Sequence, residues 1–138
     1  MKIFYLAIVL TFISCKDSQK KQAIVFCDSS NFHQPVERVS FDDIDHIKTL
    51  NGKFIEIEGF FYANFEDVAL YPSRSSHSTA KALWLNLTLP DSSLYKADKK
   101  KVAVIGRVNI FQKGHLNGYL ATLDSAFCIM EVNRGLPQ

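Results

Sequence analysis

Two long segments of alternating polarity, each with a glycine near its middle, constrain the fold of this chain most. In residues 53–62, KFIEIEGFFY, apolar side chains fall on one face with Gly59, and Glu56 and Glu58 fall on the other. Residues 102–111, VAVIGRVNIF, form a second long apolar segment around another central glycine. Alternation of this kind is typical of a half-buried strand. A central glycine lets a long strand bulge or bend, as in small barrels.

Shorter strand patterns complete an all-β chain. In residues 82–88, ALWLNLT, three leucines share one face and Trp84 lies on the other. About five strands follow one another, which predicts a five-stranded antiparallel OB-like barrel. The alternative is a β-sandwich, which usually has seven or more strands. We expect Ile57, Leu85 and Val104 in the core, and further strands at 69–71 and 119–132, with 23–27 as a candidate strand.

One short helix precedes the main strands. Apolar residues at helical spacing run through FDDIDHIKTL, residues 41–50. Ser40 with Asp43 three residues later resembles a capping box, with Asp in place of Glu or Gln. Asn51 and Gly52 follow, and both tolerate the left-handed conformation that ends a helix. The pattern predicts a helix of about ten residues.

Residues 36–132 resemble a family of uncharacterised bacterial OB-fold-like domains, many of them exported or lipid-anchored. The matching features are the short helix before Asn51-Gly52-Lys53 and the strand that follows it. Further matches are Ala69-Leu70-Tyr71-Pro72-Ser73, Ala82-Leu83-Trp84-Leu85, Val102–Val108, Gly114-His115-Leu116 and Gly118-Tyr119-Leu120. The resemblance implies an OB-like barrel and carries no assigned reaction.

The first 15 residues, MKIFYLAIVLTFISC, indicate export. A positive Lys2, a short apolar run and a small residue before Cys15 are typical of a secretory signal. The run is shorter than the ~20 apolar residues of a spanning helix. Phe12-Ile13-Ser14-Cys15 resembles the bacterial lipoprotein lipobox, although that family prefers Leu where Phe12 stands. The resemblance implies cleavage before Cys15 and a lipid on its thiol and amine.

We therefore divide the chain into a signal peptide (1–14), a lipidated Cys15 with a polar tether (15–35) and a barrel domain (36–138). Of the 16 basic residues, Lys2 is in the signal, which leaves 15 against 14 acidic residues. This balance argues against nucleic-acid binding, which needs a clustered basic face. The expected location is the bacterial cell envelope, facing the periplasm or the cell surface. Two or more acyl chains give stable membrane attachment.

Cys27 and Cys128 remain after Cys15 takes the lipid. An exported compartment permits disulfides, and two cysteines allow one pairing. The alternative is two buried free thiols, which pack as small apolar side chains. Sequence spacing alone does not show whether their Cα atoms are close.

His115, Tyr71 and Trp84 are the candidate binding residues. His115 stands between glycines in KGHLNG, where it either contacts a ligand or fixes the turn by a hydrogen bond. Tyr71 and Trp84 either pack in the core or offer a stacking platform with Tyr62 and Phe65. Trp84 is the best candidate for the platform, because its leucine neighbours define the opposite face.

The polar residues do not form a nucleophile, base and orienting set, so we assign no catalytic residue. Asp42 and His46 lie four apart on the predicted helix, but a metal needs three or four ligands, and first-turn carboxylates favour the helix dipole. We expect no metal or cofactor. The sequence favours a non-enzymatic module for a protein, peptide or glycan. The alternative is a hydrolase-like or other enzyme with its site at the His115 hairpin.

Overall fold

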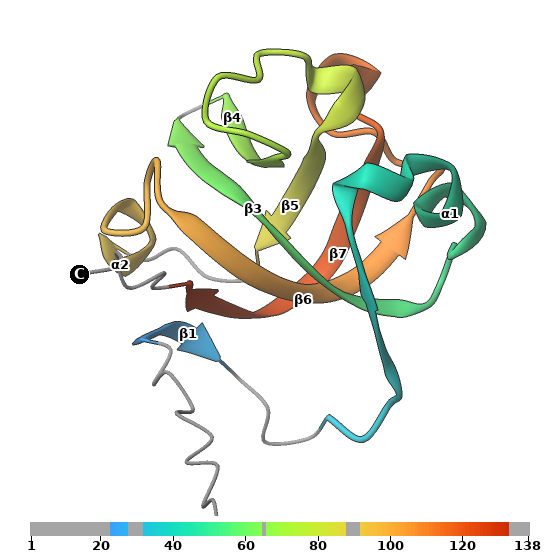
Figure 1. The fold of residues 1–138 in the computed structure, drawn as a ribbon, viewed down its shortest axis with the longest axis horizontal. Helices are drawn as coiled ribbons and strands as arrows, with labels where there is room; N and C mark the ends of the chain where they lie inside the picture. Colours follow the sequence, from blue (N-terminus) through green and yellow to red (C-terminus); the bar gives the residue numbers. More distant parts are fainter. Residues whose placement is uncertain (1–22, 28–31, 65, 88–91, 133–138) are drawn as a thin grey trace, which may run out of the picture.

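Five strands close into a ring in the computed structural model, which describes residues 23–27, 32–64, 66–87 and 92–132 (Figure 1). The order around the ring is β3, β4, β5, β7, β6 and back to β3. The strands are β3 (Phe54–Asn64), β4 (Asp67–Tyr71), β5 (Leu83–Leu87), β6 (Lys101–Asn109) and β7 (Ala121–Glu131). The predicted all-β class and five-stranded OB-like barrel are confirmed.

One of the five strand pairings in the ring is parallel. β5 pairs with β7 in the same direction, with Leu83 opposite Ala121 and Leu85 opposite Leu123. The other four pairings are antiparallel, as the sequence analysis expected for all of the strands. β5 and β7 run in the same direction because β6, which lies between them along the chain, runs opposite to both. A parallel pair needs such a crossover and cannot be joined by a tight turn.

Two short strands lie outside the ring and each pairs with one of its strands. β1 (Ala23–Cys27) pairs antiparallel with the last residues of β7, and β2 (Val36–Val39) pairs parallel with the first residues of β3. Between them, Phe32 packs against Phe54 and Phe127, with ring centroids 4.8 Å and 4.3 Å away. The folded unit therefore includes residues that the sequence analysis assigned to the tether.

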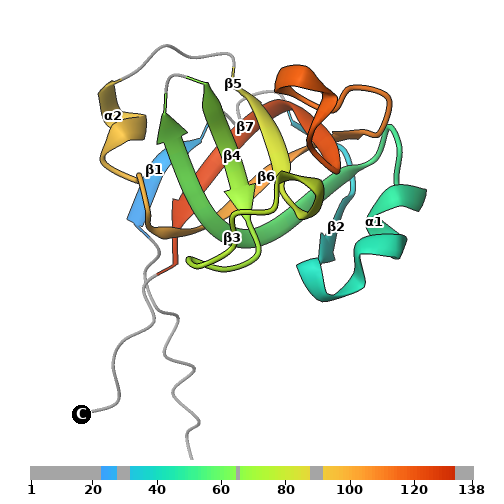
Figure 2. The same ribbon diagram turned by 90° about the horizontal axis from the view of Figure 1, so that it is seen from above.

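The predicted helix consists of a 3-10 turn, η1 (Phe41–Asp43), followed by α1 (Ile44–Thr49). Ser40 accepts a hydrogen bond from the Asp42 N–H, and Asp43 accepts one from the His46 N–H. Two successive caps thus replace the single expected capping box. Gly52 follows with φ of 80°, as predicted for the helix stop. The four-residue α2 (Ser92–Tyr95) lies at the other end of the barrel (Figure 2).

The barrel interior is filled by the inward side chains of all five strands. Ile57, Leu85 and Val104 are buried, as predicted. Phe41 and Ile47 close one end of this core, and Leu94 lies in it from α2 at the other. Each fully buried side chain of this size contributes about 1.5–3 kcal/mol of hydrophobic stabilisation.

The two central glycines serve different purposes. At Gly106 the β6–β7 register shifts, so the predicted bulge is present there. At Gly59 the β3–β6 register is unbroken. A Cβ at Gly59 would lie 2.7 Å from the Tyr71 carbonyl oxygen and 2.9 Å from the Phe41 ring. Gly59 thus lets Phe41 approach the backbone of β3.

A disulfide joins Cys27 of β1 to Cys128 of β7, which are directly opposite in register. Its partners are 101 residues apart in the sequence. A cross-link over this separation removes much conformational freedom from the unfolded chain. The bond fastens β1 to the second half of β7.

Reduction of this disulfide should lower the free energy of unfolding by about 2–5 kcal/mol. Urea denaturation of the oxidised and reduced protein measures the difference, and a Cys27→Ser/Cys128→Ser variant should match the reduced protein. Equal denaturation midpoints for the oxidised and reduced forms would contradict the structure.

Candidate functional site

The outer face of β4 and β5 is where OB-like barrels bind ligands, beside the loop that joins the last two strands. Here that loop is residues 110–120, between β6 and β7, which we call the hairpin. Ala69 of β4 stands at the centre of the face, opposite Tyr62 of β3 and Trp84 of β5. Ala69 is fully buried, so other side chains cover this face.

Two tyrosines cover this outer face, and their hydroxyl groups both bond to the Asp67 carboxylate. The Tyr119 hydroxyl donates to Asp67 Oδ1 at 2.7 Å, and the Tyr71 hydroxyl donates to Asp67 at 3.0 Å. Tyr71 also packs edge-on against Tyr62, with ring centroids 5.1 Å apart. Trp84 packs against Tyr119 in the same way at 5.2 Å. The cluster links β4 to the end of the hairpin.

This environment favours the neutral form of both tyrosines. Burial, followed by the hydrogen bond and charge of Asp67, raises the pKa of Tyr71 to about 12. The same causes raise the pKa of Tyr119 further above its ordinary value. Ionisation would place a phenolate beside a carboxylate away from water, which is unfavourable.

The raised pKa values predict a loss of stability in alkali. Between about pH 10 and 12 the unfolded chain loses tyrosine protons that the folded chain keeps, so the free energy of unfolding falls with rising pH. Ultraviolet absorbance of tyrosinate should show two tyrosines that ionise only above the usual pH range of tyrosine. Asp67→Asn should lower the pKa of Tyr71 part of the way. Ionisation of Tyr71 and Tyr119 at the ordinary pH of tyrosine in the folded protein would refute this cluster.

The hairpin also packs directly on Trp84. A Cβ at Gly114 would lie 2.6 Å from Cβ and Cγ of Trp84, so only a glycine fits between the hairpin and the ring. Gly114 has φ of 63°, a conformation that glycine adopts without strain. Trp84 is therefore half-buried under the hairpin, and its face toward Gly114 is not free to stack on a ligand.

Gly114→Ala should displace the hairpin from Trp84 and lower stability by roughly 1–3 kcal/mol, through strain and a lost fit. Trp84 is the one tryptophan of the chain, so its fluorescence reports the displacement. Gly118→Ala is the control, because Gly118 has an ordinary φ of −88° and its nearest neighbour would be 3.4 Å away. Equal fluorescence and stability in both variants would show that Gly114 does not hold the hairpin.

The structure brings Tyr71 and Trp84 together in the cluster that covers the outer face. Trp84 lies under the hairpin that carries His115, and it faces away from the core as predicted. Tyr71 is 5% exposed, so its ring belongs to the covering cluster and is not a free platform. The His115 side chain is exposed and makes no hydrogen bond with a described residue. Backbone bonds, including Gly118 N–H to the His115 carbonyl, fix the turn instead. Phe65 lies outside the described residues.

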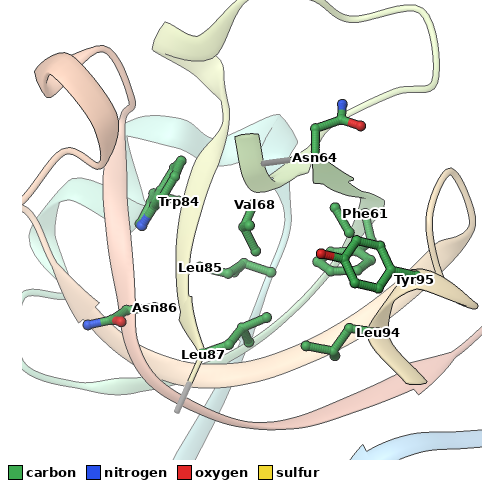
Figure 3. A pocket seen from close by; sticks show the side chains of 10 residues that line it. Phe61, Asn64, Val68, Trp84, Leu85, Asn86, Leu87, Leu94 and Tyr95 are labelled. Atoms are coloured by element: carbon green, nitrogen blue, oxygen red, sulfur yellow. The ribbon is translucent and has the colours of Figure 1, made fainter. Parts of the chain in front are cut away.

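An apolar pocket of about 260 Å³ opens between β3, β4, β5 and α2 (Figure 3). The side chains of Val68, Leu85 and Leu87 point into it, and the Tyr95 hydroxyl is directed toward the same space. Trp84 and Asn86 line it from the other side of β5. Phe61 and Leu94 form its floor near the core. We call this the barrel-end pocket.

The barrel-end pocket can bind an apolar group but offers little for catalysis. Among the described residues that line it, only Tyr95 can ionise, and its ring is 68% exposed. General acid–base catalysis needs a positioned titratable group near a nucleophile. The volume suits a small apolar moiety, since pockets for drug-sized ligands are about 300–1,000 Å³.

The helix carboxylates are used in local structure. Asp43 caps α1, and the His46 ring lies 2.6 Å from the Glu37 carboxylate, which ties α1 to β2. Asp42 accepts a hydrogen bond from the Ser40 hydroxyl. Over the ranges that the structure describes, no group of three or more His, Cys, Asp or Glu could hold a metal ion.

The sequence analysis missed Asp67 and Tyr119, which organise the outer face. They are 52 residues apart, and the carboxylate stands at the start of a short strand. A signal was present, because Tyr62, Tyr71 and Trp84 fall on outward positions of consecutive strands. Outward aromatic residues on neighbouring strands indicate a covered outer face, but not what covers it.

Comparisons with protein-family profiles, curated proteins and solved structures give no match. In the part of the chain that the structure describes, none of the helices combines the length and the apolar character required to cross a bilayer.

Proposed function

We propose that this chain is a lipid-anchored lipoprotein of the bacterial cell envelope, and that its OB-like barrel is a non-enzymatic binding module. The first 15 residues support the anchor, and they lie outside the described residues. Between Cys15 and the start of β1 stand seven residues, which reach at most about 25 Å when extended. The barrel would thus remain close to the membrane that holds Cys15.

One observation favours binding over catalysis. Val68, Leu85 and Leu87 point into the open, apolar barrel-end pocket, whereas His115 lines neither this pocket nor the groove beside the hairpin. An enzyme at the hairpin would need His115 next to a carboxylate and a nucleophile. A pocket with apolar walls and a few polar atoms at its edge is typical of a binding site.

The anchor is tested on the protein expressed in a bacterial host. Mass spectrometry of the membrane fraction should show an acylated N-terminus at Cys15, and Cys15→Ser should release the protein from the membranes. Cys27→Ser is the control, since it removes a different cysteine. An intact Met1, or a membrane-bound Cys15→Ser variant, would contradict the anchor.

The binding module is tested by capture of partners from detergent-solubilised envelopes. Tyr95→Ala should reduce the captured partner about 5–30-fold, the effect of losing 1–2 kcal/mol of binding energy. The fold should be little affected because Tyr95 is mostly exposed. His115→Ala should change neither capture nor melting temperature. Loss of capture in His115→Ala with full capture in Tyr95→Ala would overturn the assignment.

A further inference from the structure

A second depression lies at the end of the barrel away from α2. It is a groove of about 670 Å³ between α1, the 3-10 turn η2 (Thr79–Lys81) and the hairpin. Three lysines line it: Lys48 from α1, Lys81 from η2 and Lys113 from the hairpin. Ile44, Ile110 and Leu120 supply apolar lining between them. We call this the lysine groove.

The charge of the lysine groove is positive and only partly balanced. The Lys48 ammonium lies 2.9 Å from the Asp45 carboxylate, but both groups are exposed, and such pairs contribute little. Lys81 and Lys113 make no ion pair with a described residue, and none of the described carboxylates lines the groove. Like charges around an apolar floor focus the potential and attract anionic groups.

The hairpin also carries two exposed apolar side chains, on the residues next in sequence to Ile110 and Asn117, which line the groove. Phe111 is 80% exposed and Leu116 is 86% exposed, although both sit on a hairpin that is held to the barrel. Asn109 accepts hydrogen bonds from the N–H groups of Phe111 and Gln112, which fixes the start of the hairpin. An ordered segment that presents large apolar side chains to water is suited to partner binding.

The hairpin backbone is strained where Leu116 is presented. Leu116 and Asn117 have φ of 54° and 56°, in the left-handed region. This conformation is unfavourable for a leucine, and such strain persists only where the surrounding structure holds it. The packing of Gly114 on Trp84 and the bond from Tyr119 to Asp67 supply that support. These contacts of the hairpin therefore keep the Leu116 side chain exposed.

We propose that the lysine groove binds a short segment of a partner protein that carries both carboxylates and apolar side chains. The three lysines would pair with the carboxylates, and the groove floor with Phe111 and Leu116 would receive the apolar side chains. This inference goes beyond the proposed function, because it assigns the barrel a second binding site, separate from the barrel-end pocket. A polyanionic glycan fits less well, because it would leave the apolar surface unused.

The position of the groove also favours a protein over the membrane. β1 pairs with the last residues of β7, and the hairpin precedes its first residue. The 11 residues of β7 span about 35 Å, so Ala23, the first residue of β1, lies far from the hairpin. Both ribbon views place β1 and the hairpin at separate ends of the molecule (Figures 1 and 2).

The test uses the whole mature chain with Cys15→Ser, so that its own lipid does not bind vesicles. The probe is a fluorescein-labelled octapeptide that alternates glutamate with phenylalanine and leucine. Fluorescence anisotropy should show binding at least about tenfold tighter than for the same peptide with lysine in place of glutamate. Replacing its apolar residues by serine should also weaken binding. Equal affinity for the acidic and basic peptides would overturn the inference.

Charge-matched variants locate the site. Lys81→Glu/Lys113→Glu should weaken the peptide about tenfold or more, whereas Lys53→Glu/Lys96→Glu, with the same change in net charge, should have less than about a twofold effect. Phe111→Ser/Leu116→Ser should weaken it as well. Equal effects of the two charge variants would place binding elsewhere and reject the groove.

Phosphatidylglycerol vesicles test the alternative that the lysine groove contacts a membrane. Binding of vesicles that depends on Lys81 and Lys113, without binding of the acidic peptide, would identify a membrane-contact surface and overturn the proposal. Tyr95→Ala should leave peptide binding unchanged. Failure at the lysine groove is therefore distinct from failure of the anchor or the barrel-end pocket, which Cys15→Ser and Tyr95→Ala test separately.

Discussion

The pairing of β7 is the constraint on which the rest of the structure depends. Along one edge it pairs with β6 over nearly its whole length, and along the other it pairs first with β5 and then with β1. The parallel pairing with β5 closes the barrel, and the disulfide at Cys128 fixes β1 to β7. Because its start follows the hairpin and its end lies beside β1, β7 also sets the distance between the two ends of the molecule.

Closure of the outer face has the main functional consequence. In this barrel the face of β4 and β5 is covered by Tyr71, Tyr119 and the hairpin, so the surface that OB-like barrels commonly use is occupied by the chain itself. Open surface remains at the two ends, in the barrel-end pocket and the lysine groove. The cover has a second effect, since it makes the hairpin a rigid support for Phe111 and Leu116.

The sequence predicted those features that depend on local pattern. Alternation located the strands, Asn51-Gly52 located the helix stop, and Gly106 located a bulge. It did not predict β2, because the parallel pairing of Val36–Val39 with β3 depends on a register that no local signal carries. The role of Gly59 was also hidden, since the approach of Phe41 becomes visible only when the helix is placed.

The candidate site was predictable only in part, for the same reason. The outward orientation of Trp84 followed from its leucine neighbours, but the partner that covers it, Gly114, is 30 residues further along the chain. Tyr71 was a candidate platform because its own strand, which begins with Asp67, gave no sign of Tyr119. The lysine groove joins residues from α1, η2 and the hairpin, and no spacing in the sequence relates them.

Amide hydrogen exchange tests the central claim, that the hairpin is locked over the outer face, most directly. The Tyr119 N–H bonds to the Lys113 carbonyl and the Leu120 N–H bonds to the Ala82 carbonyl, each at 3.0 Å. If the hairpin is locked, these two amides should exchange nearly as slowly as those of β5 and β7. Exchange at the rate of an open loop, with the barrel strands still protected, would contradict the account.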